Sequence, residues 1–199
     1  ARVKSDSQEQ ARKAAEEGTR IHDACECLFR GLPFPEQYRP HAEAVRAKVH
    51  ELFPGITDWT AEASFAHESG YGGKVDLHSP STGIVIDYKG KDGDFTDGKK
   101  LAYDQHWQLG GYSQGLTLPT APGANIFFSR THHGLVAAHV WKESDIQAGI
   151  RIFNAALQLW KDLKGFDPAW KAQRAVADNT RTEDVAIPAS NRAKHSTTG

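Results

Sequence analysis

Apolar residues recur at helical spacing near the start of the chain and then change to short, almost continuous runs. Over residues 6–30 they recur every three or four positions between charged residues, which predicts an amphipathic helix. The segment Gly31-Leu-Pro33-Phe-Pro35 ends this helix, because proline cannot continue the backbone hydrogen-bond pattern. A second helix is expected over about 36–53, ending before Pro54-Gly55.

Strand patterns follow these helices. They predict three strands, over about 57–68, 71–78 and 83–90. Gly72-Gly73 and the segment 79–83 (Ser-Pro-Ser-Thr-Gly) supply the turn residues between them. The run Gly83-Ile-Val-Ile86 is apolar and β-branched, which is typical of a strand buried on both faces.

A polar segment, residues 90–100, separates these strands from the second half of the chain. There the patterns predict a helix, two strands and a long amphipathic helix, over about 101–117, 124–129, 135–141 and 143–164. This order of elements implies an α/β fold with a central mixed β-sheet flanked by helices. We expect a single domain over 1–175, followed by a polar tail over 176–199.

Composition and charge fit an ordinary globular protein. The chain has 199 residues, of which 39% are hydrophobic and 25% are charged. The net charge of −1 excludes a generic polyanion binder, although acidic metal ligands can offset basic phosphate contacts in an enzyme. No apolar run approaches the ~20 residues that span a bilayer, and no secretory pattern opens the sequence. We therefore expect an intracellular, cytoplasmic protein with no membrane association.

The chain has two cysteines, Cys25 and Cys27. On a helix their side chains diverge by about 200°, which disfavours a disulfide or a shared metal site. Two cysteines also exclude a four-cysteine zinc or iron–sulfur site within one chain. We expect buried or spectator thiols and a reducing compartment.

Charged residues interrupt two neighbouring apolar strands. Asp76 ends Gly-Gly-Lys-Val-Asp, and Asp87 and Lys89 lie two apart in Ile-Val-Ile-Asp-Tyr-Lys. Residues two apart in a strand point to the same face, so Asp87 and Lys89 project together while Tyr88 faces the other way. Two carboxylates suit a hard cation such as Mg²⁺, and a nearby lysine can orient a water or neutralise charge at a phosphate.

Exposed charges on an edge strand are the alternative interpretation, since patterns this short are common by chance. However, aspartate and lysine are poor strand formers, and here they interrupt a strongly apolar strand. This local conflict favours a functional site.

Four further short motifs occur in order around these three residues. Gly18-Thr-Arg-Ile-His22 lies on the first predicted helix, Glu62 on the first strand, Gly73-Lys-Val-Asp76 on the second strand, and Gln108-Leu-Gly-Gly-Tyr112 on the helix after the lysine. Together the motifs resemble those of the PD-(D/E)XK nuclease superfamily, specifically its RecB-like exonuclease branch, which has phage, CRISPR-adaptation and mitochondrial members. The resemblance spans residues 18–112, about half of the chain.

The resemblance implies a restriction-endonuclease-like core with the element order αβββαβ and a divalent metal cofactor, Mg²⁺ or Mn²⁺. It also implies that Lys89 is the catalytic lysine and that the metal ligands are His22, Asp76, Asp87 and the backbone carbonyl of Tyr88. For His22 the alternative is a core or surface histidine with a local hydrogen bond, because a single histidine is rarely diagnostic.

Other matched positions also have structural alternatives. Glu62 fits a solvent-facing strand position; as a site residue it would contact metal through water or help to hold Lys89. Gln108 and Tyr112 lie four apart on one helical face, which in the family contacts the nucleic-acid strand or braces the metal-binding strand. An ordinary amphipathic helix with Tyr112 in the core is the alternative. Gly110-Gly111 would permit close approach of a backbone or strand.

Basic and aromatic residues outside the motifs are further candidates for DNA contact. Lys91, Lys99 and Lys100 lie in or beside the polar loop, where they could touch phosphates. The loop itself lacks the turn glycine and closing glutamate of a calcium site. His132-His133 fits a turn better than a metal site. Most of the five tryptophans fit core positions, although the set could include a base-stacking residue.

We therefore expect a divalent-metal-dependent deoxyribonuclease, bacterial or phage-encoded, that hydrolyses phosphodiester bonds from a free end of single- or double-stranded DNA. The combination of His22 with Gln108 and Tyr112 favours an exonuclease. A structure-specific or restriction-type endonuclease on the same core is the alternative among enzymes. A catalytically silent nucleic-acid-binding module is the alternative from another class, and the intact carboxylate–lysine set argues against it.

Overall fold

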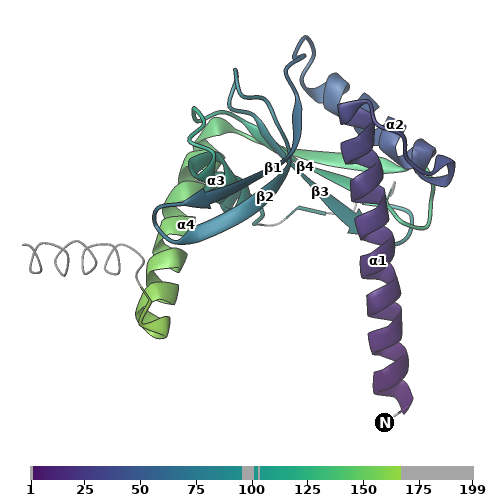
Figure 1. The fold of residues 1–199 in the computed structure, drawn as a ribbon, viewed down its shortest axis with the longest axis horizontal. Helices are drawn as coiled ribbons and strands as arrows, with labels where there is room; N and C mark the ends of the chain where they lie inside the picture. Colours follow the sequence, from purple (N-terminus) through teal and green to yellow (C-terminus); the bar gives the residue numbers. More distant parts are fainter. Residues whose placement is uncertain (1, 96–100, 103, 167–199) are drawn as a thin grey trace, which may run out of the picture.

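The computed structural model of the protein describes residues 2–95, 101–102 and 104–166 (Figure 1). The predictions for the tail 176–199, for Trp170 and for Lys99 and Lys100 lie outside the described residues. Within this part of the chain, the elements follow the predicted order, and the predicted α/β fold with a central mixed sheet is confirmed.

Two helices precede the first strand, and two more follow the third. The helical elements are α1 (Arg2–Arg30), the 3-10 turn η1 (Glu36–Tyr38), α2 (Arg39–Leu52), α3 (His106–Gly115) and α4 (Glu143–Lys164). The strands are β1 (Thr60–His67), β2 (Tyr71–His78), β3 (Val85–Lys91), β4 (Gly123–Ser129) and β5 (Val136–Trp141). None of the described helices is both long and apolar enough to cross a membrane.

The five strands form one sheet in the order β1-β2-β3-β4-β5. All neighbouring pairs are antiparallel except β3 and β4, which run parallel and are joined through α3. Their pairing continues from Val85↔Gly123 to Lys91↔Ser129, and every residue of β4 is buried. The carboxyl ends of β3 and β4 therefore lie side by side in the middle of the sheet.

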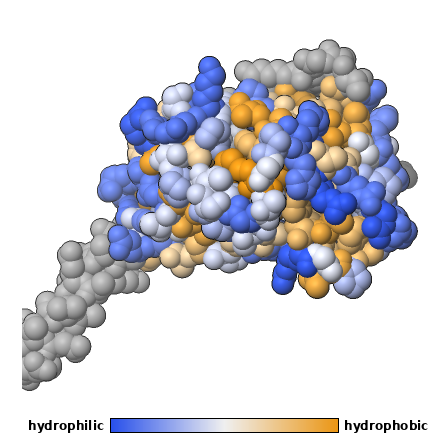
Figure 2. All heavy atoms as spheres, turned by 90° about the horizontal axis from the view of Figure 1, so that it is seen from above, coloured by the Kyte–Doolittle hydropathy of each residue, from blue (hydrophilic) through white to orange (hydrophobic). Residues whose placement is uncertain are grey.

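The sheet is covered on both faces, with α1 and α2 on one side and α3 and α4 on the other (Figure 1). The core under α1 and α2 includes Ile21, Val45, Leu77, Ile86 and Ile126. The core under α3 and α4 includes Val75, Val85, Leu109, Phe127 and Ile146. Burial of each such side chain contributes about 1.5–3 kcal/mol, which holds the helices on the sheet. On the face seen from above, hydrophilic and hydrophobic residues are interspersed (Figure 2).

Two local predictions were wrong. The helix expected from residue 101 begins at His106, because Leu101 and Ala102 are outside any helix and pack into the core under α3 and α4. Gly72-Gly73 lie inside β2 rather than in a turn. The turn before β2 instead uses Gly70, whose φ of 86° is readily available only to glycine.

Glycines allow α3 and α4 to pack with their backbones in contact. A Cβ atom on Gly110 would lie 2.6 Å from the backbone nitrogen of Ile150, and one on Gly149 would overlap the carbonyl oxygen of His106. One on Gly111 would lie 2.8 Å from the ring of Phe153. The close approach predicted for Gly110-Gly111 is therefore made by α4.

We predict that Gly149→Ala lowers the free energy of unfolding by about 1–3 kcal/mol, because the added methyl group must push α3 and α4 apart. Urea denaturation followed by circular dichroism measures this change. Gly18→Ala is the matched control, since Gly18 lies within α1 and has open space around its Cβ position. It is expected to raise stability by up to about 1 kcal/mol. Equal effects of the two substitutions would contradict the close packing.

Candidate active site

The candidate site forms where β2 and β3 separate. Their antiparallel pairing covers Leu77↔Ile86 and His78↔Val85, although both strands continue past it. Just beyond the paired region, the backbone N–H of Tyr88 donates to Asp76 Oδ2 at 2.6 Å. The Asp76 carboxylate thus accepts a hydrogen bond from a backbone N–H of β3 that would otherwise donate to a backbone carbonyl of a paired strand. This bond holds the Asp76 side chain beside residues 87–89.

A backbone irregularity in β1 lies opposite Asp76. Glu62 has a φ of 57°, in the left-handed region that non-glycine residues seldom occupy, and the residues flanking it pair with Leu77 and Val75. Residues two apart in a strand normally share a face, yet Leu77 packs under α1 and α2 while Val75 packs under α3 and α4. The alternation of β2 is therefore broken at Asp76, between the two cores.

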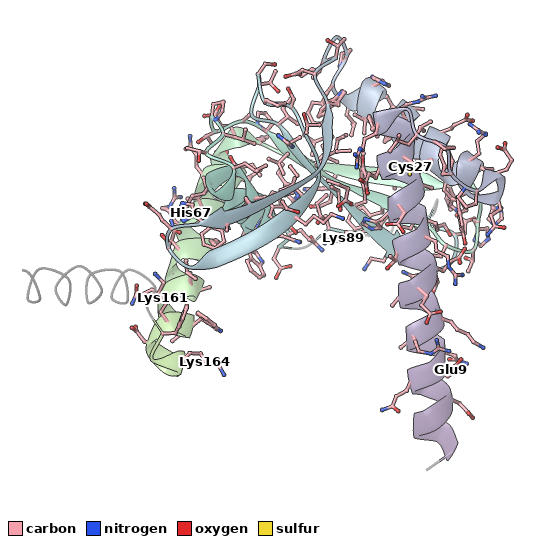
Figure 3. The ribbon with its side chains drawn as sticks, in the orientation of Figure 1. Glu9, Cys27, His67, Lys89, Lys161 and Lys164 are labelled. Carbon is pink, nitrogen blue, oxygen red and sulfur yellow. The ribbon has the colours of Figure 1, made fainter. Side chains whose placement is uncertain are left out.

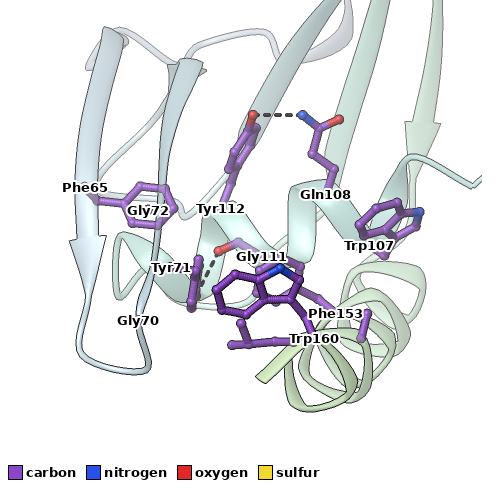
Figure 4. A pocket seen from close by; sticks show the side chains of 12 residues that line it. Phe65, Gly70, Tyr71, Gly72, Trp107, Gln108, Gly111, Tyr112, Phe153 and Trp160 are labelled. Carbon is purple, nitrogen blue, oxygen red and sulfur yellow. Dashed lines mark hydrogen bonds between the residues drawn. The ribbon is translucent and has the colours of Figure 1, made fainter. Parts of the chain in front are cut away.

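Lys89 projects from β3 (Figure 3) and is held by a residue of its own strand and by one of α3. Its Nζ donates to Asp87 at 2.8 Å from Oδ2 and 3.0 Å from Oδ1, and to Gln108 Oε1 at 3.0 Å. Gln108 Nε2 in turn donates to the Tyr112 hydroxyl at 2.8 Å (Figure 4). The Gln108–Tyr112 face of α3 therefore braces the lysine, and the Lys89 side chain remains 31% exposed.

Asp87 is the buried member of the site, with 3% of its surface exposed. Its Oδ2 accepts a hydrogen bond from Asn125 Nδ2 at 2.8 Å, and Asn125 Oδ1 accepts one from Trp141 Nε1 at 2.8 Å. Burial, reinforced by the negative charge of Asp76 and opposed by Lys89, raises the pKa of Asp87 to about 6. A cation beside these two carboxylates would stabilise the charged form of Asp87.

His22 brings α1 to the same place. Its Nδ1 lies 3.3 Å from Asp76 Oδ1. The ring packs against Tyr88 and Phe128, with centroid distances of 5.7 and 5.4 Å. Two predicted metal ligands, His22 on α1 and Asp76 on β2, therefore lie in contact, and Asp87 on β3 is near enough to be influenced by the charge of both.

The donor atoms fit a hard divalent cation. In the described part of the chain, no group of three or more His, Cys, Asp or Glu side chains is arranged to hold a metal ion by itself. Mg²⁺ does not need such a cage, since it takes one or two carboxylates and keeps waters or substrate phosphate as its other ligands. Asp76 and Asp87 match that requirement, and the imidazole of His22 also suits a transition metal. The Tyr88 carbonyl stays a predicted ligand.

Glu62 lies close to these residues but has another partner. Its nearly buried carboxylate forms an ion pair with Lys74, whereas Lys89 pairs with Asp87 and Gln108. Glu62 and Lys74 line a cavity of about 330 Å³ together with His22 on α1. Arg130 completes the basic part of its lining. The cavity thus joins acidic, basic and imidazole groups at the edge of the candidate site.

The remaining predicted positions are more peripheral. Lys91 is exposed at the end of β3, and its carbonyl accepts the backbone N–H of Arg130 at 2.8 Å. His132-His133 lies in the connection between β4 and β5, as predicted. Cys25 is buried, and both cysteines are free thiols; burial raises the pKa of the Cys25 thiol above its ordinary value.

Two supporting groups, Asn125 and Arg130, were not predicted from the sequence. Asn125 interrupts the apolar run Ala-Asn-Ile-Phe-Phe, which was a detectable signal, but its bonds to Asp87 and Trp141 depend on the pairing of β4 with β3 and β5. Arg130 follows β4, and its Nη1 lies 2.8 Å from the position of a Cβ atom on Gly90. Its Nε donates to Asp92 Oδ1 at 2.8 Å. The guanidinium of Arg130 therefore places a positive charge next to Gly90, the residue that follows Lys89 on β3.

Comparisons with known proteins add little to this description. No known protein family matches the sequence, and no similar curated protein was found. Among the solved structures, one titled "Crystal structure of SSO0001" aligns with a TM-score of 0.32 and 15% sequence identity. The alignment covers 57% of this chain and 58% of that one, so the chain spans little more than half of the matched structure. A likeness this weak carries no functional conclusion.

We predict that Asn125→Ala lowers the free energy of unfolding by about 1–3 kcal/mol, because it leaves the Trp141 N–H and one Asp87 oxygen without their buried partner. Thermal and urea unfolding measure the loss. Asn154→Ala is the control, because Asn154 is exposed and its side chain bonds to that of Gln114, which is itself partly exposed. Its change should stay within about 0.5 kcal/mol. A neutral Asn125→Ala would show that the buried network contributes nothing to stability.

Proposed function

We propose that the protein is a divalent-metal-dependent deoxyribonuclease of the PD-(D/E)XK type, acting as an exonuclease on a DNA end. The observation that carries this proposal is the convergence of Asp76, Asp87 and Lys89 at the gap between β2 and β3. The resemblance of the sequence motifs to the RecB-like branch supports the same conclusion independently of the geometry.

The site differs from an ordinary surface ion pair. Lys89 pairs with a carboxylate that is almost completely buried, and both residues are held by neutral side chains, Gln108 and Asn125. Burying a charge is unfavourable unless it is paired and hydrogen-bonded, so a purely structural role would be met more simply by apolar residues. This arrangement supports a catalytic role.

Each side chain has a distinct role in the proposed reaction. Asp76 and Asp87 would hold the metal ion, with His22 completing the site on the side of α1. The bound metal would supply an activated water and neutralise charge on the scissile phosphate. Lys89 Nζ, fixed between two acceptors, would donate to the attacking water or to a phosphate oxygen as negative charge develops. Gln108 acts through the lysine and is a positioning residue.

Arg130 and Lys74 provide positive charge near the same place. Both line the cavity that contains His22, and Arg130 lies over Gly90 next to Lys89. They are suited to contact the phosphates that flank the scissile bond. An intracellular location fits this function and the free thiols of Cys25 and Cys27.

Digestion of end-labelled DNA tests the proposal. Linear single-stranded, linear double-stranded and covalently closed DNA are incubated with Mg²⁺, with Mn²⁺ or with chelator. We expect metal-dependent loss of linear DNA and no cleavage of closed circles. Cleavage of closed circles would indicate the endonuclease alternative, and binding without any cleavage would indicate the silent module.

We predict that Lys89→Ala reduces cleavage by at least about 10²–10³-fold, because the ammonium group near the reacting phosphate is lost. The rate of product formation under single-turnover conditions measures this effect. Lys48→Ala is the control: it removes a lysine on α2 whose partner is Glu51, and cleavage should stay unchanged. Circular dichroism checks that both variants fold. Full activity of a folded Lys89→Ala protein would rule out the mechanism.

A further inference from the structure

A second cavity, of about 440 Å³, lies beside the candidate site and shares Gln108 and Tyr112 with it (Figure 4). It is bounded by the β1–β2 hairpin, α3 and α4. Half of its twelve lining residues are aromatic, namely Phe65, Tyr71, Trp107, Tyr112, Phe153 and Trp160. The proposed nuclease mechanism uses Gln108 and Tyr112 but leaves the other rings without a role.

Several of these rings are fixed by their neighbours. The Tyr71 hydroxyl donates to the Gly111 carbonyl at 3.2 Å, and its ring packs against Phe153 with a centroid distance of 4.7 Å. Phe65 packs edge-on against both Tyr71 and Tyr112. The inner wall of the cavity is therefore rigid and apolar before any ligand binds.

The two indoles differ from the inner rings. Trp107 on α3 is 39% exposed, and Trp160 on α4 is 44% exposed. Tryptophan is highly buried on average, so two half-exposed indoles that line one cavity are candidates for ligand contact, although Trp160 also packs edge-on against Phe166. Most tryptophans were predicted to be core residues, which holds for Trp141 and Trp59.

We propose that this aromatic cavity binds unpaired nucleobases, and hence that the protein acts on a DNA end with single-stranded character. The inference rests on the proposed nuclease function. It follows from continuity: Gln108 lines this cavity, and its Oε1 accepts a hydrogen bond from Lys89 Nζ at 3.0 Å. A base bound in the cavity would thus keep the adjoining phosphates near the candidate site.

The aromatic lining of the cavity determines which form of DNA it can bind. Aromatic faces stack on any base and read no sequence, with a contribution of about 1–3 kcal/mol per base. Bases within a duplex are already stacked on their neighbours and must be unpaired before they can enter, which is unfavourable by a few kcal/mol. The cavity therefore favours an unpaired strand over a blunt duplex end.

Binding measurements in a Lys89→Ala background, which is expected not to degrade the probe, test this proposal. Fluorescence anisotropy compares oligothymidine with an oligonucleotide of equal length made of abasic nucleotides. Both probes carry the same phosphates, so the difference reports the bases. We expect oligothymidine to bind ~5- to 100-fold more tightly. In the added double substitution Trp107→Ala/Trp160→Ala, that preference should disappear while abasic binding stays the same.

Two controls isolate the aromatic faces. Leu159→Ala removes an exposed apolar side chain next to Trp160 that does not line the cavity, and the preference should persist. Trp107→Phe/Trp160→Phe keeps aromatic faces and should restore most of the preference. Quenching of tryptophan fluorescence by oligothymidine, but not by the abasic probe, gives a test that needs no cavity substitution.

Several outcomes would overturn the proposal. Equal affinity for oligothymidine and the abasic probe would show that no base is bound, and so would an unchanged preference in the folded alanine double variant. Light scattering that shows a dimer lost on Trp107→Ala/Trp160→Ala would assign the surface to a second copy of the chain. Failure of the proposed nuclease function would be recognised separately. The protein with Lys89 intact would then leave all DNA uncleaved with Mg²⁺ or Mn²⁺, whichever of the two oligonucleotides binds more tightly.

Discussion

The buried carboxylate of Asp87 is the constraint on which the candidate site depends. A negative charge within a sheet is strongly unfavourable unless positive charge and hydrogen bonds surround it. Lys89 and Asn125 meet this need, and each is fixed in turn by a further group, Gln108 on α3 and Trp141 on β5. The charge of Asp87 thus links β3 to α3 and β5, and it determines the position of the Lys89 ammonium group.

The separation of β2 from β3 leaves room for the Asp76 carboxylate beside β3. If the two strands stayed paired, their backbones would close the sheet over the position where Asp76 now bonds to the Tyr88 N–H. The left-handed backbone of Glu62 lies at the same level, and the alternation of β2 breaks there. Strain of this kind is typical of functional positions, which a strongly packed fold can sustain.

Most of the fold was predictable from the sequence because the hydrophobic pattern of each element is local. The strand 71–78 and the helix 143–164 were predicted with their actual bounds. The start of α3 was not, because Leu101 and Ala102 follow a helical pattern but pack against the core from outside the helix. Asp76, Asp87 and Lys89 were found by their conflict with the surrounding strands. Partners that only tertiary pairing brings together, such as Asn125, were not found.

The glycine contact between α3 and α4 has a consequence for how the molecule can move. Because the two backbones touch at Gly110 and Gly149, the helices cannot slide or tilt independently without a clash. Trp107 and Gln108 lie on α3, and Trp160 lies on α4. The two indoles and the amide that braces the lysine are therefore carried by two helices whose backbones are in contact. Displacement of either helix would be transmitted to the ammonium group, so in the proposed function the binding of a DNA strand and the position of the lysine would be coupled.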